Sequence, residues 1–310
     1  MRLQNQRQIY GETLLDLGRE NKNIVVLEAD LCKSTMTTLF EQEYPDRFFE
    51  MGIGEANMTS FAAGLSLTGK IAFTNSFAVF AAGRAFDQIR QGICIPGLNV
   101  KIVGSSAGLS DFGDGATHQS VEDISIMRAI PNMTVLAPAD GIETRKMIRK
   151  MVEYNGPVYL RLNRHDLPDI FPENKEFIIG KPYMIRDGKD VVVFGNGIMV
   201  YRALRAAEML EKAGISVRVV NVSSLKPVNE SEIKRFAHGM KGIVTAEEHS
   251  VIGGLASVIT FILGGNGIPF RHIAIQDQFG QSAHSYDELL DEYGLNTDNI
   301  MGSVKEILNN

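Results

Sequence analysis

Cysteine is scarce in this chain, and long apolar runs are missing. Only Cys32 and Cys94 occur, without the spacing of metal ligands, which favours a reducing cytoplasm. No apolar stretch approaches the ~20 residues that span a bilayer. The first residues lead directly into an amphipathic helical pattern and lack the apolar core of a signal peptide. The sequence therefore predicts a cytoplasmic protein that does not cross a membrane.

Positive charge is also in deficit. The formal net charge is -6, which disfavours a surface for nucleic acid or anionic lipid and predicts neither as a partner. Apolar residues make up 44% and charged residues 22% of the chain, as in ordinary globular proteins. A length of 310 residues suits two domains, each large enough to bury its own core.

Apolar β-branched runs alternate with helical stretches along the first half of the chain. This alternation predicts an α/β fold, with a parallel sheet that carries helices on its faces. Ligands bind beyond the carboxyl ends of the strands in such sheets, so the loops that follow them are candidates for a site. The expected strands are Ile24–Leu27, Ile71–Thr74, Val100–Val103, Met133–Leu136 and Val158–Leu162, and the expected helices are Ala56–Leu67, Ala78–Gln91 and Ile142–Tyr154.

The alternation lapses between Asp169 and Asp187, where proline, glycine and charged residues gather. We therefore predict a first domain over residues 1–172, a linker over 173–186 and a second α/β domain over 187–310. Each domain should hold a mostly parallel sheet flanked by helices. The expected strands of the second domain are Val191–Phe194, Val217–Val222, Gly242–Thr245 and Phe270–Ile275, and its expected helices are Met199–Ala213, Leu255–Leu263 and Ser303–Leu308.

Glu55 is the first candidate for chemistry. It follows Gly52 and Gly54 and opens an expected helix, where the helix dipole favours a carboxylate by ~0.3–1 kcal/mol whatever its role. The apolar helix behind it, with Met58 and Phe61, offers a poorly solvated setting for a charge-assisted hydrogen bond. The aminopyrimidine of thiamine diphosphate needs such a group, because a carboxyl at its far ring nitrogen makes the cofactor's amine basic.

Two pairs of residues follow Glu55. Phe77 and Phe80 are three residues apart and share a face if their stretch is helical, either in the core or as a stacking surface for a ring. Asp114 and His118 lie in a glycine-rich loop, as turn residues or as partners of sugar hydroxyls, with His118 as a donor or proton relay. The Gly-Asp-Gly at Asp114 is not a magnesium motif, because no suitable second ligand follows it.

Taken in order, these segments resemble the transketolase family across essentially the whole chain. The resemblance covers the family's pyrimidine-binding and C-terminal domains, without its diphosphate-binding domain. The chain therefore resembles the smaller subunit of a split transketolase. The segments that carry the resemblance are Gly54-Glu55-Ala56-Asn57-Met58, Gly113–Gln119, Arg128–Met133, Glu247-Glu248-His249 and Asp277–Ser282.

The resemblance implies roles at the cofactor. Glu55 corresponds to the glutamate that activates thiamine diphosphate, and Phe77 to the ring that stacks on its pyrimidine. Asp30 and Phe80 would line the same pocket. His118 would act in catalysis.

The resemblance also implies substrate contacts. Asp114 and His118 would hold the hydroxyls of donor and acceptor sugars. Arg7, Ser34 and Arg164 correspond to the family's terminal phosphate binders, and guanidinium groups suit tetrahedral oxyanions. Ser106 departs from the pattern, because it stands where transketolases usually carry a phosphate-binding histidine. The end group could therefore be a phosphate held more weakly, a sulfonate or the phosphate of a branched sugar.

A partner is implied as well. An N-terminal, diphosphate-binding subunit would supply the ligands of the diphosphate and of Mg²⁺, with two copies of each subunit. The expected activity is transfer of a two-carbon ketol unit from a ketose to an aldose, both small sugars and anionic ones in particular. Three alternatives stay open: a deoxyxylulose phosphate synthase-like protein, the β subunit of a 2-oxo acid dehydrogenase's first component, and a noncatalytic scaffold subunit.

Overall fold

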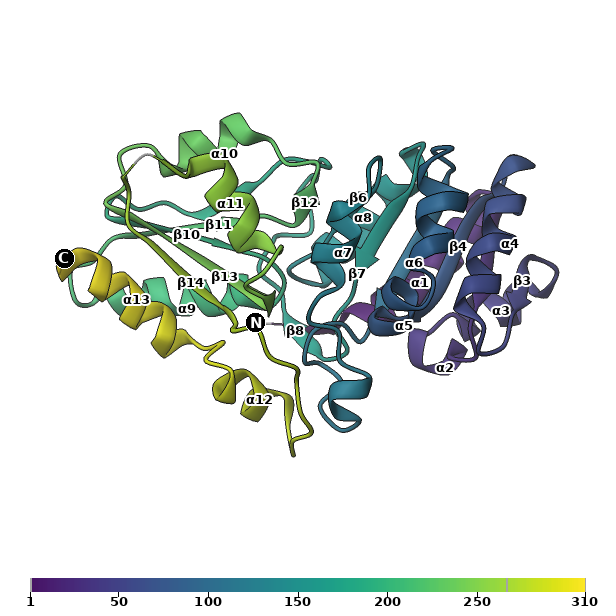
Figure 1. Cartoon of the computed structure of the whole chain (residues 1–310), viewed down its shortest axis with the longest axis horizontal. Coiled ribbons are helices and arrows are strands. Elements are labelled where there is room, and N and C mark those ends of the chain that lie inside the picture. The colour runs from purple at the N-terminus through teal and green to yellow at the C-terminus, as the bar shows by residue number, and fades with distance from the viewer. Residues whose placement is uncertain (1, 266, 310) are drawn as a thin grey trace.

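Two sheets with helices on their faces make up the molecule, as Figure 1 shows for this computed structural model, which describes residues 2–265 and 267–309. Within these residues the first sheet has the strand order β12-β6-β7-β5-β4-β2-β3 and the second has the order β14-β13-β10-β11-β9. The predicted α/β class with two mostly parallel sheets is confirmed.

The first sheet is parallel along the run from β6 to β3. Its central strand β5 is buried at every position, as expected for a parallel sheet covered on both faces. The strands are β2 (Ile24–Glu28), β3 (Phe48–Glu50), β4 (Ile71–Phe77), β5 (Val100–Ser105), β6 (Thr134–Leu136), β7 (Val158–Arg161) and β12 (Ser224–Lys226).

Helices cover both faces of this sheet. The expected helix Ala78–Gln91 is wrong as a single element, because the chain forms two short α-helices and then a π-helical segment. The helical elements are α1 (Gln6–Glu20), α2 (Cys32–Thr35), α3 (Thr38–Glu43), η1 (Pro45–Arg47), α4 (Glu55–Leu67), α5 (Ala78–Gly83), α6 (Phe86–Gln88), η2 (Ile89–Cys94), η3 (Gly115–Thr117), α7 (Asp123–Ala129) and α8 (Gly141–Glu153).

The second sheet is parallel except for its edge strand β9. Its strands are β9 (Tyr183–Arg186), β10 (Val191–Gly195), β11 (Val217–Asn221), β13 (Gly242–Ser250) and β14 (Phe270–Ile275). Its helices are α9 (Met199–Glu211), α10 (Glu230–Ala237), α11 (Leu255–Leu263), α12 (Tyr286–Glu292) and α13 (Thr297–Asn309). A further pair, β1 (Leu3–Asn5) with β8 (Asp166–Pro168), is antiparallel.

Buried polar contacts join the two halves. The Arg161 guanidinium donates to Asp123 at 3.0 Å and to the Glu248 carbonyl at 2.8 Å, and Arg161 is only 8% exposed. The Glu248 carboxylate in turn accepts the backbone N–H of Leu109 at 2.7 Å. A buried charge is tolerated only when it is paired in this way, so these contacts fix one half against the other.

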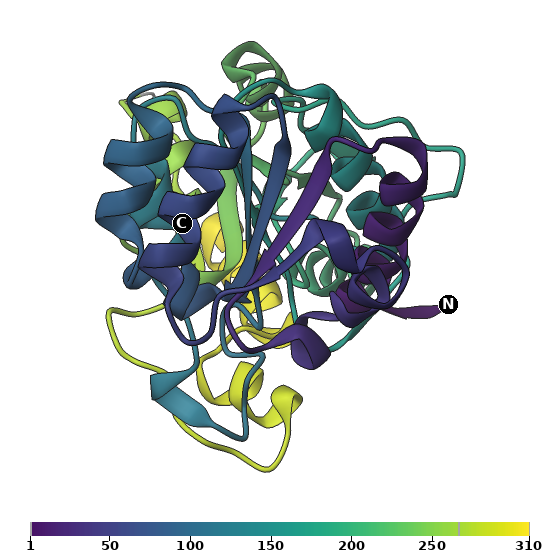
Figure 2. The same ribbon diagram turned by 90° about the vertical axis from the view of Figure 1, so that its right-hand side faces the viewer.

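The segment before α12 packs on the loop that holds η3, and Figure 2 shows the two side by side. The N–H of Ala283 donates to the Phe112 carbonyl at 3.0 Å, and the Gln119 amide donates to the Gln281 carbonyl at 3.0 Å. The second half of the chain thereby supports a loop of the first. Within the described residues, no helix has the length and apolar character needed to cross a membrane.

Candidate active site

Glu55 lies where the sequence places it, as the first residue of α4. Its side chain is buried, at 3% exposure for the residue. Oε1 accepts a hydrogen bond from Nη1 of Arg84 at 3.0 Å and faces the Ser76 hydroxyl at 3.5 Å. Among the described residues, no hydrogen-bond donor reaches Oε2. One carboxylate oxygen is therefore held, and the other can accept a ligand hydrogen bond.

An aromatic cluster adjoins this carboxylate. Phe77 ends β4, directly after Ser76, and its ring lies 6.1 Å from that of Phe80 at an interplanar angle of 14°. The His118 ring approaches both edge-on, at centroid distances of 6.2 Å and 5.3 Å. Arg84 closes the group, with its guanidinium carbon 4.0 Å from the centre of the Phe80 ring. The structure thus brings Glu55 and three predicted ring residues together.

The loop with Asp114 and His118 is fixed from two sides. Gly115 has a φ of 74°, and a Cβ there would collide with the Ser282 hydroxyl, so only glycine allows this close approach. Nδ1 of His118 lies 2.9 Å from the Thr117 hydroxyl. Asp114 itself is exposed at the start of η3. The histidine ring and this carboxylate are both accessible from the same loop.

Two of the predicted anion binders come together in space. Burial lowers the pKa of Arg7 to about 10, helped by the positive charge of nearby Arg164. Nη1 of Arg7 donates to the Ser34 carbonyl at 2.8 Å, so Ser34 contributes its backbone here. Nε of Arg7 is buried without a hydrogen-bond partner among the described residues. Two guanidinium groups so close together favour a negatively charged ligand.

Asp111 belongs to this group and was not predicted. Its Oδ2 accepts from Nη1 of Arg164 at 2.6 Å, and its side chain is 3% exposed. Burial raises the pKa of Asp111, Asp114 raises it further, and the Arg164 charge opposes both. The only sequence signal was a second aspartate three positions before Asp114.

Ser106 and Asp30 occupy strand ends near these residues. Ser106 follows β5, has a φ of 53° and is fully buried, and its hydroxyl lacks a hydrogen-bond partner among the described residues. Asp30 follows β2 with a φ of 59°, and its N–H donates to Glu50 at 2.9 Å while its side chain is exposed. The strands β2, β4 and β5 are adjacent and parallel. Ser106 and Asp30 therefore lie at the same end of the sheet as Phe77, where these strands have their carboxyl ends.

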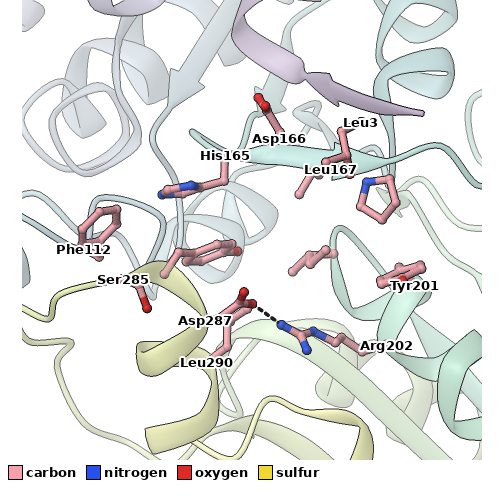
Figure 3. Close-up of a pocket in the computed structure, with 13 residues that line it drawn as sticks. Leu3, Phe112, His165, Asp166, Leu167, Tyr201, Arg202, Ser285, Asp287 and Leu290 are labelled. Carbon is pink, nitrogen blue, oxygen red and sulfur yellow. Dashed lines mark hydrogen bonds and ion pairs between the residues drawn. The ribbon is translucent and has the colours of Figure 1, made fainter. Parts of the chain in front are cut away.

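A cavity of about 640 Å³ lies elsewhere, at the junction of the two halves (Figure 3). His165 stacks there on Tyr286 at 4.6 Å, and Arg202 pairs with Asp287 across the opening at 2.5 Å. None of the predicted site residues lines it. The predicted residues Asp30, Phe77 and Ser106 instead lie at the carboxyl ends of β2, β4 and β5. No metal-binding cluster of acidic, histidine or cysteine side chains occurs within the described ranges.

Comparisons with known proteins match both halves of the chain. The family model described as "Transketolase, pyrimidine binding domain" matches residues 4–169, and "Transketolase, C-terminal domain" matches residues 180–300.

Individual relatives and a solved structure agree. The 6-deoxy-6-sulfo-D-fructose transketolase subunit SqwH of Clostridium sp. (strain MSTE9) is 41% identical over 97% of this chain and 94% of its own length. The B subunit of the apulose-4-phosphate transketolase of Phocaeicola vulgatus is 36% identical over 97% of both chains. A solved structure described as a split gene transketolase, inactive beta4 tetramer, has a TM-score of 0.88 at 44% identity and covers 98% of both chains.

Proposed function

Because this chain belongs to the transketolase family and is a counterpart of the smaller subunit of split transketolases, we propose that it forms half of a thiamine diphosphate-dependent enzyme. The reaction would move a two-carbon ketol unit from a ketose to an aldose. The observation that carries the proposal is the buried Glu55 carboxylate, which has one free oxygen beside the rings of Phe77, Phe80 and His118.

The residues present fit the aminopyrimidine of the cofactor. Oε2 of Glu55 is available to the far ring nitrogen, and burial makes that hydrogen bond strong. Phe77 offers an aromatic face for stacking, and Phe80 and Asp30 would line the pocket. When bound, thiamine diphosphate supplies the nucleophilic carbon of the reaction. Glu55 holds the pyrimidine in orientation and shares the proton at its ring nitrogen.

His118 would hold and move protons at the sugar hydroxyls. Its ring stands edge-on to both phenylalanines, so it borders the same space as the pyrimidine. Asp114, four residues earlier in the loop, would bind a hydroxyl of the donor or the acceptor. The second half of the chain contributes support to this loop through Ser282 and Gln281.

The far end of the sugar would meet a separate set of groups. Arg7 and Arg164 supply positive charge, Ser34 lies in α2, and Ser106 directly follows β5. An anionic end group is therefore the expected feature of the substrates. The two relatives above differ on this point, because one is named for a sulfonated sugar and the other for a sugar phosphate.

A second subunit would complete the site. We infer that an N-terminal, diphosphate-binding subunit supplies the ligands of the diphosphate and Mg²⁺, and that two copies of each subunit assemble. Such a subunit would pack against the carboxyl ends of β4 and its neighbouring strands, beside which Glu55 and Phe77 lie. The free thiols of Cys32 and Cys94 fit a reducing cytoplasm.

Replacing Glu55 with glutamine tests this proposal. In the assembled enzyme, Glu55→Gln should lower kcat by roughly two orders of magnitude or more, because an amide cannot share the pyrimidine proton. The thermal unfolding curve should stay close to that of the unmodified chain. Glu153→Gln, in an exposed ion pair with Lys150, is the matched control and should keep full turnover. A noncatalytic scaffold would be indifferent to Glu55, so near-normal turnover in the Glu55 variant would reject the assignment.

A further inference from the structure

The predicted anion site contains a carboxylate of its own. Asp111 bonds Arg164 at 2.6 Å, and its charge also acts on Arg7. Asp111 is almost fully buried, whereas 35% of the Arg164 side chain is exposed. The Arg164 guanidinium, which should face the substrate, therefore already donates one hydrogen bond to a protein carboxylate.

Both partners of this ion pair are fixed by the backbone around them. The Asp111 carbonyl accepts the Gln119 amide at 3.1 Å and the N–H of Gly115 at 3.2 Å. The Arg164 carbonyl accepts a hydrogen bond from the Asn5 side-chain amide at 2.9 Å. The backbone N–H of Arg164 donates to the Ser110 hydroxyl at 3.2 Å. These bonds hold the main chain of both residues in place, so the two side chains start from fixed positions.

Arg7, Arg164 and Asp111 together carry one net positive charge, and the charge of Asp114, which also acts on Asp111, reduces the positive field further. Arg7 and Arg164 contribute two, and Asp111 cancels one of them. At Ser106 a neutral hydroxyl stands where the family resemblance leads us to expect a histidine, so no further cation is added. Asp166, which is exposed and bonded to Asn5, reduces the field at Arg7 slightly more.

The two candidate end groups differ in charge. A phosphate monoester carries about -1.5 to -2 near pH 7 and has three strong acceptor oxygens. A sulfonate has the same tetrahedral shape and three oxygens, but it is a strong acid and carries one negative charge. A buried carboxylate beside the binding arginines repels the second charge of a phosphate, because the repulsion is weakly screened there.

We propose that Asp111 is a specificity-determining residue, which fits this anion site to a singly charged end group and so favours sulfonated over phosphorylated ketoses. This inference rests on the proposed function. It assigns the discrimination to one side chain, and it differs from the view that Asp111 only orients Arg164. A purely orienting carboxylate would affect both end groups equally.

The test compares two ketohexoses that differ only at carbon 6, one with a sulfonate and one with a phosphate. The enzyme is the complex with its N-terminal subunit, and kcat/KM is measured for each donor. The unmodified enzyme should prefer the sulfonate. Asp111→Asn should shift the ratio of kcat/KM toward the phosphate by about tenfold or more, mainly through KM. Asp287→Asn removes a carboxylate from another Asp–Arg pair and should leave the ratio unchanged.

Each remaining outcome decides a different point. If Asp111→Asn lowers kcat/KM equally for both donors, the residue only positions Arg164 and the inference is wrong. If the unmodified enzyme prefers the phosphate, the inference is wrong even if the asparagine variant fails to fold. Asp111→Glu keeps the charge and should keep the sulfonate preference. Absence of transfer from any ketose, charged or neutral, would instead overturn the proposed function itself.

Discussion

Arg84 is the residue whose contact with Glu55 has the clearest chemical consequence. Its guanidinium holds Oε1 of the buried carboxylate while stacking on the Phe80 ring, and about half of the Arg84 side chain is exposed. A neighbouring positive charge favours the ionised form of a carboxylate, whereas burial opposes it. Arg84 is therefore expected to hold the Glu55 carboxylate in place while the pyrimidine bonds its other oxygen.

Arg84→Gln tests this reading of the ion pair. Without the guanidinium, Oε1 loses its charge-assisted hydrogen bond and the carboxylate is held less firmly, so kcat should fall by about tenfold or more. The measurement is kcat of the assembled enzyme at saturating cofactor and substrates. Arg205→Gln, which breaks an exposed pair with Glu208, should leave kcat unchanged. An unchanged kcat in the Arg84 variant would show that the contact has no role in activation.

Single residues were predictable where a motif surrounds them. Glu55, Phe77 and His118 carry recognisable neighbours in the sequence, and the structure brings them together. Arg84 and Asp111 were missed, because each acts on a partner far away in the chain. Arg84 is 29 positions from Glu55, and Asp111 is 53 positions from Arg164. An isolated arginine or aspartate is usually solvated, and only the folded chain shows these pairs.

At the scale of elements, α8 and β11 meet at a buried glutamate between the two halves. Glu143 of α8 accepts hydrogen bonds from the Ser223 hydroxyl at 2.6 Å and from the Asn221 amide at 2.9 Å. The N–H of Ala139 donates to its other oxygen at 2.7 Å. Burial nevertheless outweighs these donors and raises the pKa of Glu143 to about 8.

The raised pKa predicts a stability that depends on pH. The unfolded chain releases the Glu143 proton near the ordinary glutamate pKa of 4.5, but the folded chain keeps it up to a pKa of about 8. The folded state therefore binds more protons across this window. The contribution of protonated Glu143 to the free energy of unfolding is lost as pH rises toward 8. Glu143→Gln removes the titration. The difference in free energy of unfolding between the unmodified chain and the variant should therefore become smaller from pH 5 to pH 8.

Urea unfolding at pH 5, 6.5 and 8 measures this gap. Glu292→Gln, an exposed change on α12, is the control and should give the same difference at every pH. The other buried glutamates titrate in both proteins and cancel in the comparison. A gap that stays constant for Glu143→Gln would mean that this carboxyl is already ionised in the folded protein throughout the range.

The sequence predicts the long helices and strands, whose apolar residues recur at regular intervals, but it does not predict the short ones. The strands β2, β10 and β14 lie where the sequence predicts them, and β2 and β10 are buried at every position. The strand β12 has only three residues, too few for an alternation of apolar and polar residues to be recognised. It nevertheless pairs antiparallel with β6 of the other half. The predicted helix over residues 78–91 is interrupted at Arg84, which places this side chain beside Glu55 rather than along a continuous helix. Tertiary contacts decide such details, and propensity does not.

At the scale of the whole molecule, the two α/β halves were predictable from alternation, but their junction was not. The Arg161–Glu248 and Asn163–Glu248 contacts join residues 87 and 85 positions apart. These contacts place the second half against the loop of Asp114 and His118, so the second half supports that loop. The predicted division at residues 173–186 remains a proposal, and β12 shows that the chain after it also contributes to the first sheet.

The reconstitution of ketol transfer tests the central claim most directly. The purified chain, a purified N-terminal diphosphate-binding subunit and their mixture are each assayed with thiamine diphosphate, Mg²⁺, an anionic ketose and an aldose. Only the mixture should convert the aldose into a ketose two carbons longer, and the donor ketose into an aldose two carbons shorter, because the proposed site is shared between the two subunits. Robust transfer by this chain alone would contradict the split-enzyme account, and a stable but inactive mixture would contradict the assignment as a transketolase.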